Sequence, residues 1–183
     1  MEVKGTAVKS LVKYMKKIYP EKFNDWLDLL PEEVREEFKN IIFSSRWYDV
    51  DLYMRLPILK AAEVANADVK KMAWDMGVYS SKEALSGVYR VFTKFTSISL
   101  MIKKVFLFLS TYYRPSSVEV TLLDEAKRHA VIIFRNFISA DDIIMQRIAG
   151  WGYSTLIQTG AKKVELSMEQ FAENDVIMTV DWE

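Results

Sequence analysis

The stretch Val118-Glu119-Val120-Thr121-Leu122 decides the fold class, because its apolar and polar residues alternate with a period of two. This alternation is typical of a strand with one buried face. A polar turn at 124–128 and the apolar run 131–134 follow, so we predict a β-hairpin. A second hairpin, with strands at 164–168 and 176–180, closes the chain.

The residues upstream of this stretch predict helices. Apolar side chains recur there at helical spacing, and Pro20 and Pro31 separate the first segments from one another. The segment after Ser97 is apolar on nearly every side, which is typical of a helix at the centre of a fold. We predict helices over 7–18, 21–30, 31–42, 50–66, 68–77, 80–92 and 97–109.

Local signals predict where some of these helices begin and end. Asp68 is a predicted N-cap. Gly77 suits the position that follows a helix C-terminus, where a positive φ is needed. Ser80, with Glu83 three residues later, resembles a capping box, so we expect a further helix to begin there.

These patterns together predict an α+β fold. We expect an N-terminal helical layer packed on a small antiparallel sheet, which is made of the two C-terminal β-hairpins. A helix that starts near 139–142 separates the hairpins and runs towards Gly150 or Gly160. No linker or low-complexity stretch interrupts the chain, and 183 residues suit one domain. We therefore predict a single α+β domain over residues 1–183.

The composition excludes several classes of protein. Lys and Arg total 25 and Asp and Glu also total 25, so the chain lacks the positive charge of a nucleic-acid-binding protein, and we expect no nucleic-acid partner. It contains no Cys, which excludes disulfides, thiolate zinc sites, iron–sulfur clusters and Cys nucleophiles. A single His excludes any site that needs two imidazoles. We expect neither a metal site nor a cofactor.

No membrane-spanning or secretory segment is expected. The first residues lack the continuous apolar run of a signal peptide. The most apolar stretch, 97–113, carries Lys103 and Lys104, and the run after them is far shorter than the ~20 residues that a span requires. We interpret this stretch as a buried helix, and we predict that the protein is cytoplasmic.

Catalytic motifs are not found in the sequence. Gly150-Trp151-Gly152 does not follow a predicted strand, so we interpret it as an interruption of a helix where bulky neighbours approach closely. His129 falls in or beside the first hairpin turn, and we interpret it as an exposed turn residue. We name no catalytic residue. The missing motifs favour a protein that is not an enzyme, and an enzyme with an unrecognised site stays open.

Aromatic side chains are the most unusual feature, because Phe, Trp and Tyr make up 13% of the chain. At helical spacing such residues are often part of the core, but Tyr and Trp also carry polar edges that can orient a ligand in an apolar pocket. We predict a cavity of ~300 Å³ between the helical layer and the sheet. The candidate ligand-binding residues are Trp47, Tyr48, Tyr89, Phe92, Trp151 and Tyr153, with Arg46 and Arg90 as candidates for binding an anionic group of the ligand.

Short stretches spread over nearly the whole chain resemble a bacterial family of the myxobacterial type. They are Val3-Lys4-Gly5-Thr6-Ala7, Trp47-Tyr48, Ala84 to Phe92, Gly150-Trp151 and Val180-Asp181-Trp182. That family is related to a fold group of 4-vinyl-reductase-type domains, haem–nitric-oxide-binding domains and vesicle-tethering TRAPP subunits. The resemblance implies an α+β fold in which helices cover a small antiparallel sheet, with an apolar ligand cavity between the two layers in several relatives.

The sequence departs from these relatives at two points. The 4-vinyl-reductase-type relatives often carry Cys in the closing hairpin, where this chain has Glu165-Leu166-Ser167-Met168. Haem-binding relatives attach haem to a helical His, whereas His129 lies in a predicted hairpin. The resemblance therefore implies the fold and a cavity, but neither the cofactor nor a reaction.

The predicted function is that of a non-enzymatic sensor or interaction domain, with a role in signalling, that binds a small apolar ligand, a protein partner or both. The alternative is a homodimeric structural assembly module without a ligand, as in TRAPP-like relatives. We expect a homodimer because apolar residues near the second and third helices cover more than one helical face, and a leftover patch normally marks an interface. The patch comprises Trp26, Leu29, Leu30, Phe38, Ile41, Ile42 and Phe43.

Overall fold

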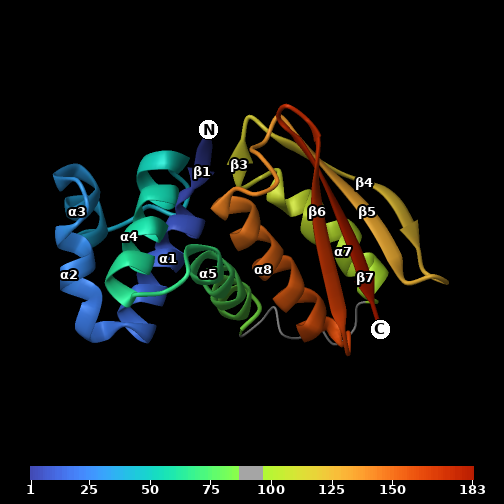
Figure 1. The fold of residues 1–183 in the computed structure, drawn as a ribbon, viewed down its shortest axis with the longest axis horizontal. Coiled ribbons are helices and arrows are strands. Elements are labelled where there is room, and N and C mark those ends of the chain that lie inside the picture. The colour runs from blue at the N-terminus through green and yellow to red at the C-terminus, as the bar shows by residue number, and fades with distance from the viewer. Residues whose placement is uncertain (87–96) are drawn as a thin grey trace.

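The first helices of the chain lie at one end of the molecule and the larger sheet lies at the other, where two later helices pack on it, as Figure 1 shows. The computed structural model describes residues 1–86 and 97–183, except for the side chains of Val105, Leu107 and Phe108. The predicted α+β fold class is confirmed. The described helices are α1 (Gly5–Ile18), α2 (Phe23–Asp28), α3 (Glu32–Lys39), α4 (Leu56–Ala65), α5 (Val69–Ala84), α7 (Ile98–Leu109) and α8 (Ile143–Thr159), with a 3-10 turn at Pro20–Lys22 and a π-helical turn at Asp51–Arg55.

The two predicted hairpins form one four-stranded antiparallel sheet. Its strands are β4 (Ser117–Asp124), β5 (His129–Arg135), β6 (Val164–Ala172) and β7 (Asp175–Trp182), in the order β4-β5-β7-β6. The two hairpins are joined in the middle, where Ile132 of β5 lies opposite Met178 of β7. Buried and partly exposed residues alternate along both inner strands, because only one face of the sheet is covered by helices.

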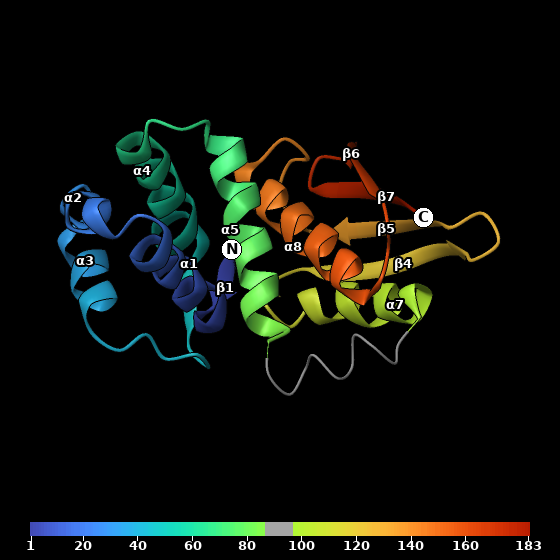
Figure 2. The ribbon, with the colours of Figure 1, turned by 90° about the horizontal axis from the view of Figure 1, so that it is seen from below.

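The helices that cover the sheet are α7 and α8, and this refines the prediction of an N-terminal layer. Helices α1 to α4 lie on the far side of α5, away from the strands (Figure 2). Lys103 and Lys104 of α7 are exposed, whereas Ile102 and Phe106 on its other side are buried. A bilayer-crossing helix is not found among the described residues, since none combines the necessary length with the necessary hydropathy.

A second, smaller sheet was not predicted. β1 (Glu2–Lys4) pairs with β2 (Trp47–Asp49) on one side and with β3 (Tyr113–Arg114) on the other. Strands of two or three residues are too short to show a period in the sequence. Through this sheet the start of α1 lies beside the segment that follows α7. Both segments contribute residues to the candidate functional site.

Two predicted breaks in helices are wrong, and close packing of α5 against α8 explains both. Gly77 lies inside α5, so neither the helix end at Gly77 nor a new start at Ser80 exists. A Cβ on Gly77 would lie 2.0 Å from the backbone oxygen of Arg147. In return, a Cβ on Gly150 would lie 2.3 Å from the backbone oxygen of Trp74, and α8 continues through Gly150 without an interruption. The glycines therefore serve helix contact and not helix termination.

The predicted apolar patch is smaller than the sequence indicated. Trp26, Leu30, Phe38 and Ile42 belong to the continuous buried core, because α2, α3 and α4 pack on one another. The patch residues that stay exposed are Leu29 (40%), Ile41 (71%) and Phe43 (59%).

Candidate functional site

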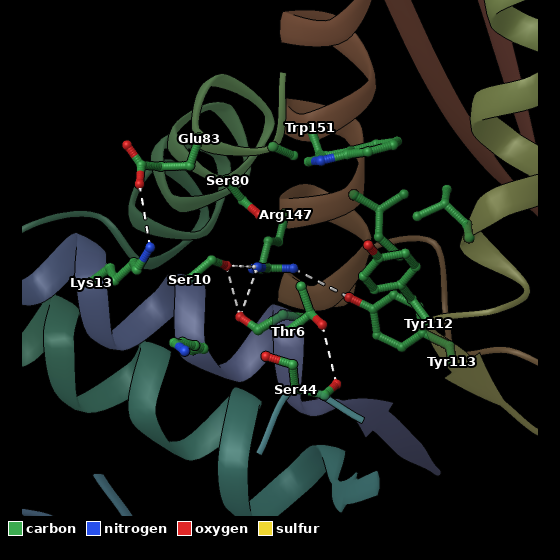
Figure 3. Close-up of a pocket in the computed structure, with 15 residues that line it drawn as sticks. Thr6, Ser10, Lys13, Ser44, Ser80, Glu83, Tyr112, Tyr113, Arg147 and Trp151 are labelled. Carbon is green, nitrogen blue, oxygen red and sulfur yellow. Dashed lines mark hydrogen bonds and ion pairs between the residues drawn. The ribbon is translucent and has the colours of Figure 1, made fainter. Parts of the chain in front are cut away.

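A cavity of about 310 Å³ opens at the surface between α1, α5, α8 and the segment that follows α7. Exposed residues such as Thr6 and Lys9 form its rim, and buried residues such as Ala7 and Ile148 form its floor. Figure 3 shows the side chains of these elements converging on it. The lining residues are Thr6, Ala7, Lys9, Ser10, Lys13, Ser44, Ser80, Glu83, Ala84, Leu109, Tyr112, Tyr113, Arg147, Ile148 and Trp151.

The guanidinium of Arg147 lies at the centre of this site (Figure 3). Its Nη2 donates to Ser10 Oγ at 2.9 Å and to the backbone oxygen of Ala7 at 3.3 Å. Its Nη1 donates to the hydroxyl of Tyr113 at 3.4 Å. The side chain therefore connects α8 with the start of α1 and with β3.

The charge of Arg147 has no counter-charge among the described residues. The residue is only 4% exposed, yet none of the ion pairs between described residues includes it. Its Nε is buried and has no hydrogen-bond acceptor in the part of the chain that the structure describes. Burial of an ionised group is costly unless the group is paired. The protein thus holds a desolvated positive charge at the wall of an accessible cavity.

Tyr113 is a neutral hydrogen-bonding group next to this charge. Burial raises the pKa of Tyr113, while the neighbouring Arg147 guanidinium opposes that rise. The ring packs edge-on against Phe137 at 5.4 Å between centroids, which fixes its direction. Because the hydroxyl oxygen accepts from Arg147, its own proton is available to a further acceptor.

The rim of the cavity is also mainly cationic. Lys9 and Lys13 lie on the exposed side of α1, and the only carboxylate among the lining residues that the structure describes is that of Glu83. Glu83 lies 3.6 Å from Lys13 and 3.8 Å from Lys17, so its charge is shared by two lysines. The site as a whole therefore favours an anion over a cation.

Of the predicted ligand-binding residues that the structure describes, Trp151 lines the cavity. Trp47 lies in β2 under the cations of Lys4 (4.2 Å) and Arg114 (4.3 Å). Tyr153 packs against Trp74 on the other side of α8, with 5.4 Å between ring centroids. Neither residue is part of the wall.

Two other candidate ligand-binding residues, Tyr48 and Arg46, belong to a different cluster. The Tyr48 hydroxyl donates to Glu37 Oε1 at 2.6 Å, and the exposed Arg46 lies 3.4 Å from the same oxygen. Tyr89, Arg90 and Phe92 fall outside the described residues. The cluster around Glu37 is thus a polar contact of α3 with β2 and the residue before it, and none of its three side chains lines the cavity.

The cavity differs from the predicted one in position as well as in lining. It lies among helices α1, α5 and α8 and the segment that follows α7, and not between the helical layer and the sheet. The sequence analysis missed Arg147, although a signal exists: this charged residue shares a face of α8 with Ile144 and Trp151, at i−3 and i+4. A charge on the apolar side of a helix marks a side chain that needs a partner.

Residues that bind metals in other proteins do not gather here. No group of three or more His, Asp and Glu side chains suited to a metal ion occurs in residues 1–86 and 97–183. His129 begins β5, and its Nδ1 lies 2.8 Å from Asp181 Oδ1 on the neighbouring strand. It is half-buried and paired, which corrects its interpretation as an exposed turn residue.

Comparison with known proteins identifies the fold. No protein-family model matches the sequence, and no curated protein matches it. A mutant H-NOX protein from K. algicida, in the Fe(II) unliganded form, is similar in structure with a TM-score of 0.74 at 10% identity, over 98% of this chain and 96% of that chain. An H-NOX protein from S. oneidensis in the Fe(II)NO ligation state has a TM-score of 0.71 at 12% identity, over 98% and 99%. A mutant of T. Tengcongensis H-NOX has a TM-score of 0.68 at 14% identity, over 98% and 97%.

At these identities the similarity establishes the fold of the haem–nitric-oxide-binding domains and not the ligand. The relation to a myxobacterial-type family, to 4-vinyl-reductase-type domains and to TRAPP subunits stays a prediction.

Proposed function

We propose that this chain is a non-enzymatic domain of the sensor type, which binds a small, partly apolar organic ligand in the cavity between α1, α5 and α8. The cavity carries the proposal: its volume of about 310 Å³ lies at the lower end of the range for ligand pockets, and Leu109, Ile148 and Trp151 give it an apolar wall. The similar structures support it, since their descriptions as Fe(II) unliganded and Fe(II)NO forms concern binding and not turnover. A cytoplasmic location is part of the proposal.

Haem, which those descriptions suggest for the fold, does not fit the described residues that line this cavity. Haem iron is held by His, Cys, Met or Tyr. The chain has no Cys, its one His is paired with Asp181 on the sheet, and the lining residues include no Met. Among the phenols of the cavity, the raised pKa of Tyr113 opposes the phenolate form. The cavity holds about ten water molecules by volume, whereas a haem has several times that number of non-hydrogen atoms, so a haem is too large for it.

The proposal is tested by closing the cavity. Ser80→Phe places a phenyl ring in the cavity from the α5 side, whereas Lys82→Phe places the same ring on the exposed side of α5. Native mass spectrometry of the purified wild-type protein is expected to show a bound small molecule, either copurified or taken up from a fragment mixture. Ser80→Phe is expected to lose it and Lys82→Phe to keep it. A wild-type protein that takes up no fragment contradicts the proposal.

A homodimeric assembly module is the second candidate, and the exposed apolar residues Leu29, Ile41 and Phe43 favour it. We propose that a second copy covers them. Light scattering is then expected to give a mass near twice 21.3 kDa, which Phe43→Asp reduces to that of one chain. Leu122→Asp is the matched control, because Leu122 is also an exposed apolar residue (48%, against 59% for Phe43) but lies on β4 at the other end of the molecule. A wild-type monomer at high concentration contradicts the dimer.

A further inference from the structure

We propose that the cavity takes a monocarboxylate with a short apolar chain, and that Arg147 is the residue that binds its carboxylate. This inference rests on the proposed ligand-binding function and names the chemical class of the ligand. The observation that carries it is a buried guanidinium that has no counter-charge among the described residues and lies at the wall of a cavity that opens to solvent.

The existing contacts of Arg147 position the guanidinium but do not neutralise it. Ala7 and Ser10 supply a carbonyl and a hydroxyl oxygen, and Tyr113 supplies a second hydroxyl. All three acceptors are uncharged. A bound carboxylate would supply the opposite charge that these acceptors lack, and Arg–carboxylate pairs are frequently bidentate, which adds energy and geometric specificity.

Donors are left over for such a group. A guanidinium has five N–H donors, and the described contacts of Arg147 use three of them at most. The Tyr113 proton is also free of a described acceptor, since that hydroxyl accepts from Arg147. A carboxylate beside the Nη1 end of Arg147 therefore finds both a guanidinium N–H and a phenolic O–H.

One negative charge matches this site better than two. Among the described lining residues Arg147 is the single buried cation, Lys13 already faces Glu83, and Lys9 is exposed at the rim. A phosphate monoester carries ≈ −1.5 to −2 charges and three strongly accepting oxygens. A doubly charged group would therefore have one buried cation to pair with among the described lining residues. The carboxylate is thus the anion whose charge and acceptors the floor can satisfy.

The remaining wall determines the rest of the ligand. Leu109, Ile148 and Trp151 supply apolar surface next to Arg147, and Ala7 leaves the space open because its side chain is short. The volume of about 310 Å³ is that of about ten water molecules. A straight-chain acid such as octanoate has a suitable number of non-hydrogen atoms.

The experiment compares octanoate, 1-octanol and inorganic phosphate as probes of the full chain by isothermal titration calorimetry. Octanoate and 1-octanol have the same number of carbon atoms in an unbranched chain and differ in charge. We expect octanoate to bind with a Kd at least tenfold lower than that of 1-octanol, and phosphate not to compete. Arg147→Met is expected to weaken octanoate at least tenfold and to leave 1-octanol unchanged.

Two variants make the result specific. Arg35→Met is the matched control, because Arg35 also has a buried Nε without an acceptor but lies on α3 near Asp28, away from the cavity. It is expected to leave octanoate binding unchanged. Tyr113→Phe removes the hydroxyl alone and is expected to weaken octanoate severalfold. If Arg147→Met does not fold, the comparison of octanoate with 1-octanol in the wild-type protein and the effect of Tyr113→Phe test the carboxylate assignment.

The outcomes separate this inference from the proposed function. Equal binding of octanoate and 1-octanol, together with no effect of Arg147→Met, overturns the carboxylate assignment and leaves the cavity as a binding site. Tight competition by inorganic phosphate overturns the choice of anion. Binding of none of the probes, with no fragment taken up by the wild-type protein, overturns both proposals.

Discussion

Replacement of Gly77 by Ala is a direct test of the packing between α5 and α8. A Cβ at this position would lie 2.0 Å from the backbone oxygen of Arg147 and 2.9 Å from the backbone nitrogen of Trp151. Ordinary van der Waals contacts of a Cβ begin near 3.4 Å, so the two backbones would have to separate by about 1.4 Å. Backbone atoms cannot rotate away as a side chain can. The cost therefore falls on the whole helix contact.

Two opposing effects set the magnitude. Overpacking costs about 1–3 kcal/mol, and a clash with backbone belongs at the upper end. Ala in place of Gly inside a helix stabilises by about 1 kcal/mol. We expect a net loss of about 2 kcal/mol in the free energy of unfolding. At an m-value of about 2 kcal/mol/M in urea, the midpoint would fall by about 1 M.

The assay is urea unfolding followed by circular dichroism, with Gly152→Ala as the control. Among the described residues, a Cβ at Gly152 would meet the ring of Phe106 alone, at 3.2 Å. A ring can shift by a few tenths of an ångström, so this variant is expected to stay within about 1 kcal/mol of the wild type. A stabilised Gly77→Ala variant would refute the reasoning, because it would show that helix propensity alone acts at this position.

Two further predictions concern single side chains. Burial and the hydrogen bond to Glu37 raise the pKa of Tyr48 to about 12, so the folded state holds this proton more tightly than the unfolded state. The free energy of unfolding is therefore expected to fall as the pH rises from about 10 to about 12. Glu37→Gln should lower the pKa of Tyr48, which ultraviolet titration measures. Asp142 caps α8 through Ile144 N at 2.8 Å and pairs with Arg55 Nη2 at 2.7 Å. Asp142→Ala should therefore lower the free energy of unfolding by about 1–2 kcal/mol in urea, and Asp142→Asn by less, because it keeps the cap; equal losses would show that the cap contributes nothing.

The parts of the fold that follow from local patterns could be predicted from the sequence. The alternation at 118–122 and the apolar run after the polar turn are sufficient for β4 and β5, because side-chain direction in a strand changes with every residue. Asp68 caps α5 as expected, accepting from the Lys71 amide at 2.8 Å. Gly160 ends α8 with φ +112°, which suits glycine.

Glycines with a tertiary role could not be predicted in the same way. The local sequence around Gly77 fits a helix terminus as well as a helix interior, since the serines that follow can cap or can face a neighbouring helix. In the fold, the hydroxyl oxygen of Ser81 lies 2.9 Å from that of Thr155 on α8. Ser81, which follows the predicted cap Ser80, therefore makes a buried contact with the neighbouring helix. The partner helix, which lies some 70 residues downstream, decides between the two interpretations.

The candidate site depends on tertiary contacts still more strongly. The sequence contains Arg147 on the apolar face of a predicted helix, which is enough to predict a buried charge that requires a hydrogen-bonding or charged partner. It does not show that the partners are Ala7 and Ser10, about 140 residues upstream, and Tyr113, because those positions are brought together by tertiary contacts such as the pairing of β1 with β3. Nor does it show that no described carboxylate reaches Arg147. Net charge is balanced over the chain as a whole, and the unbalanced charge that distinguishes the site exists only at the point where α1, α8 and β3 converge.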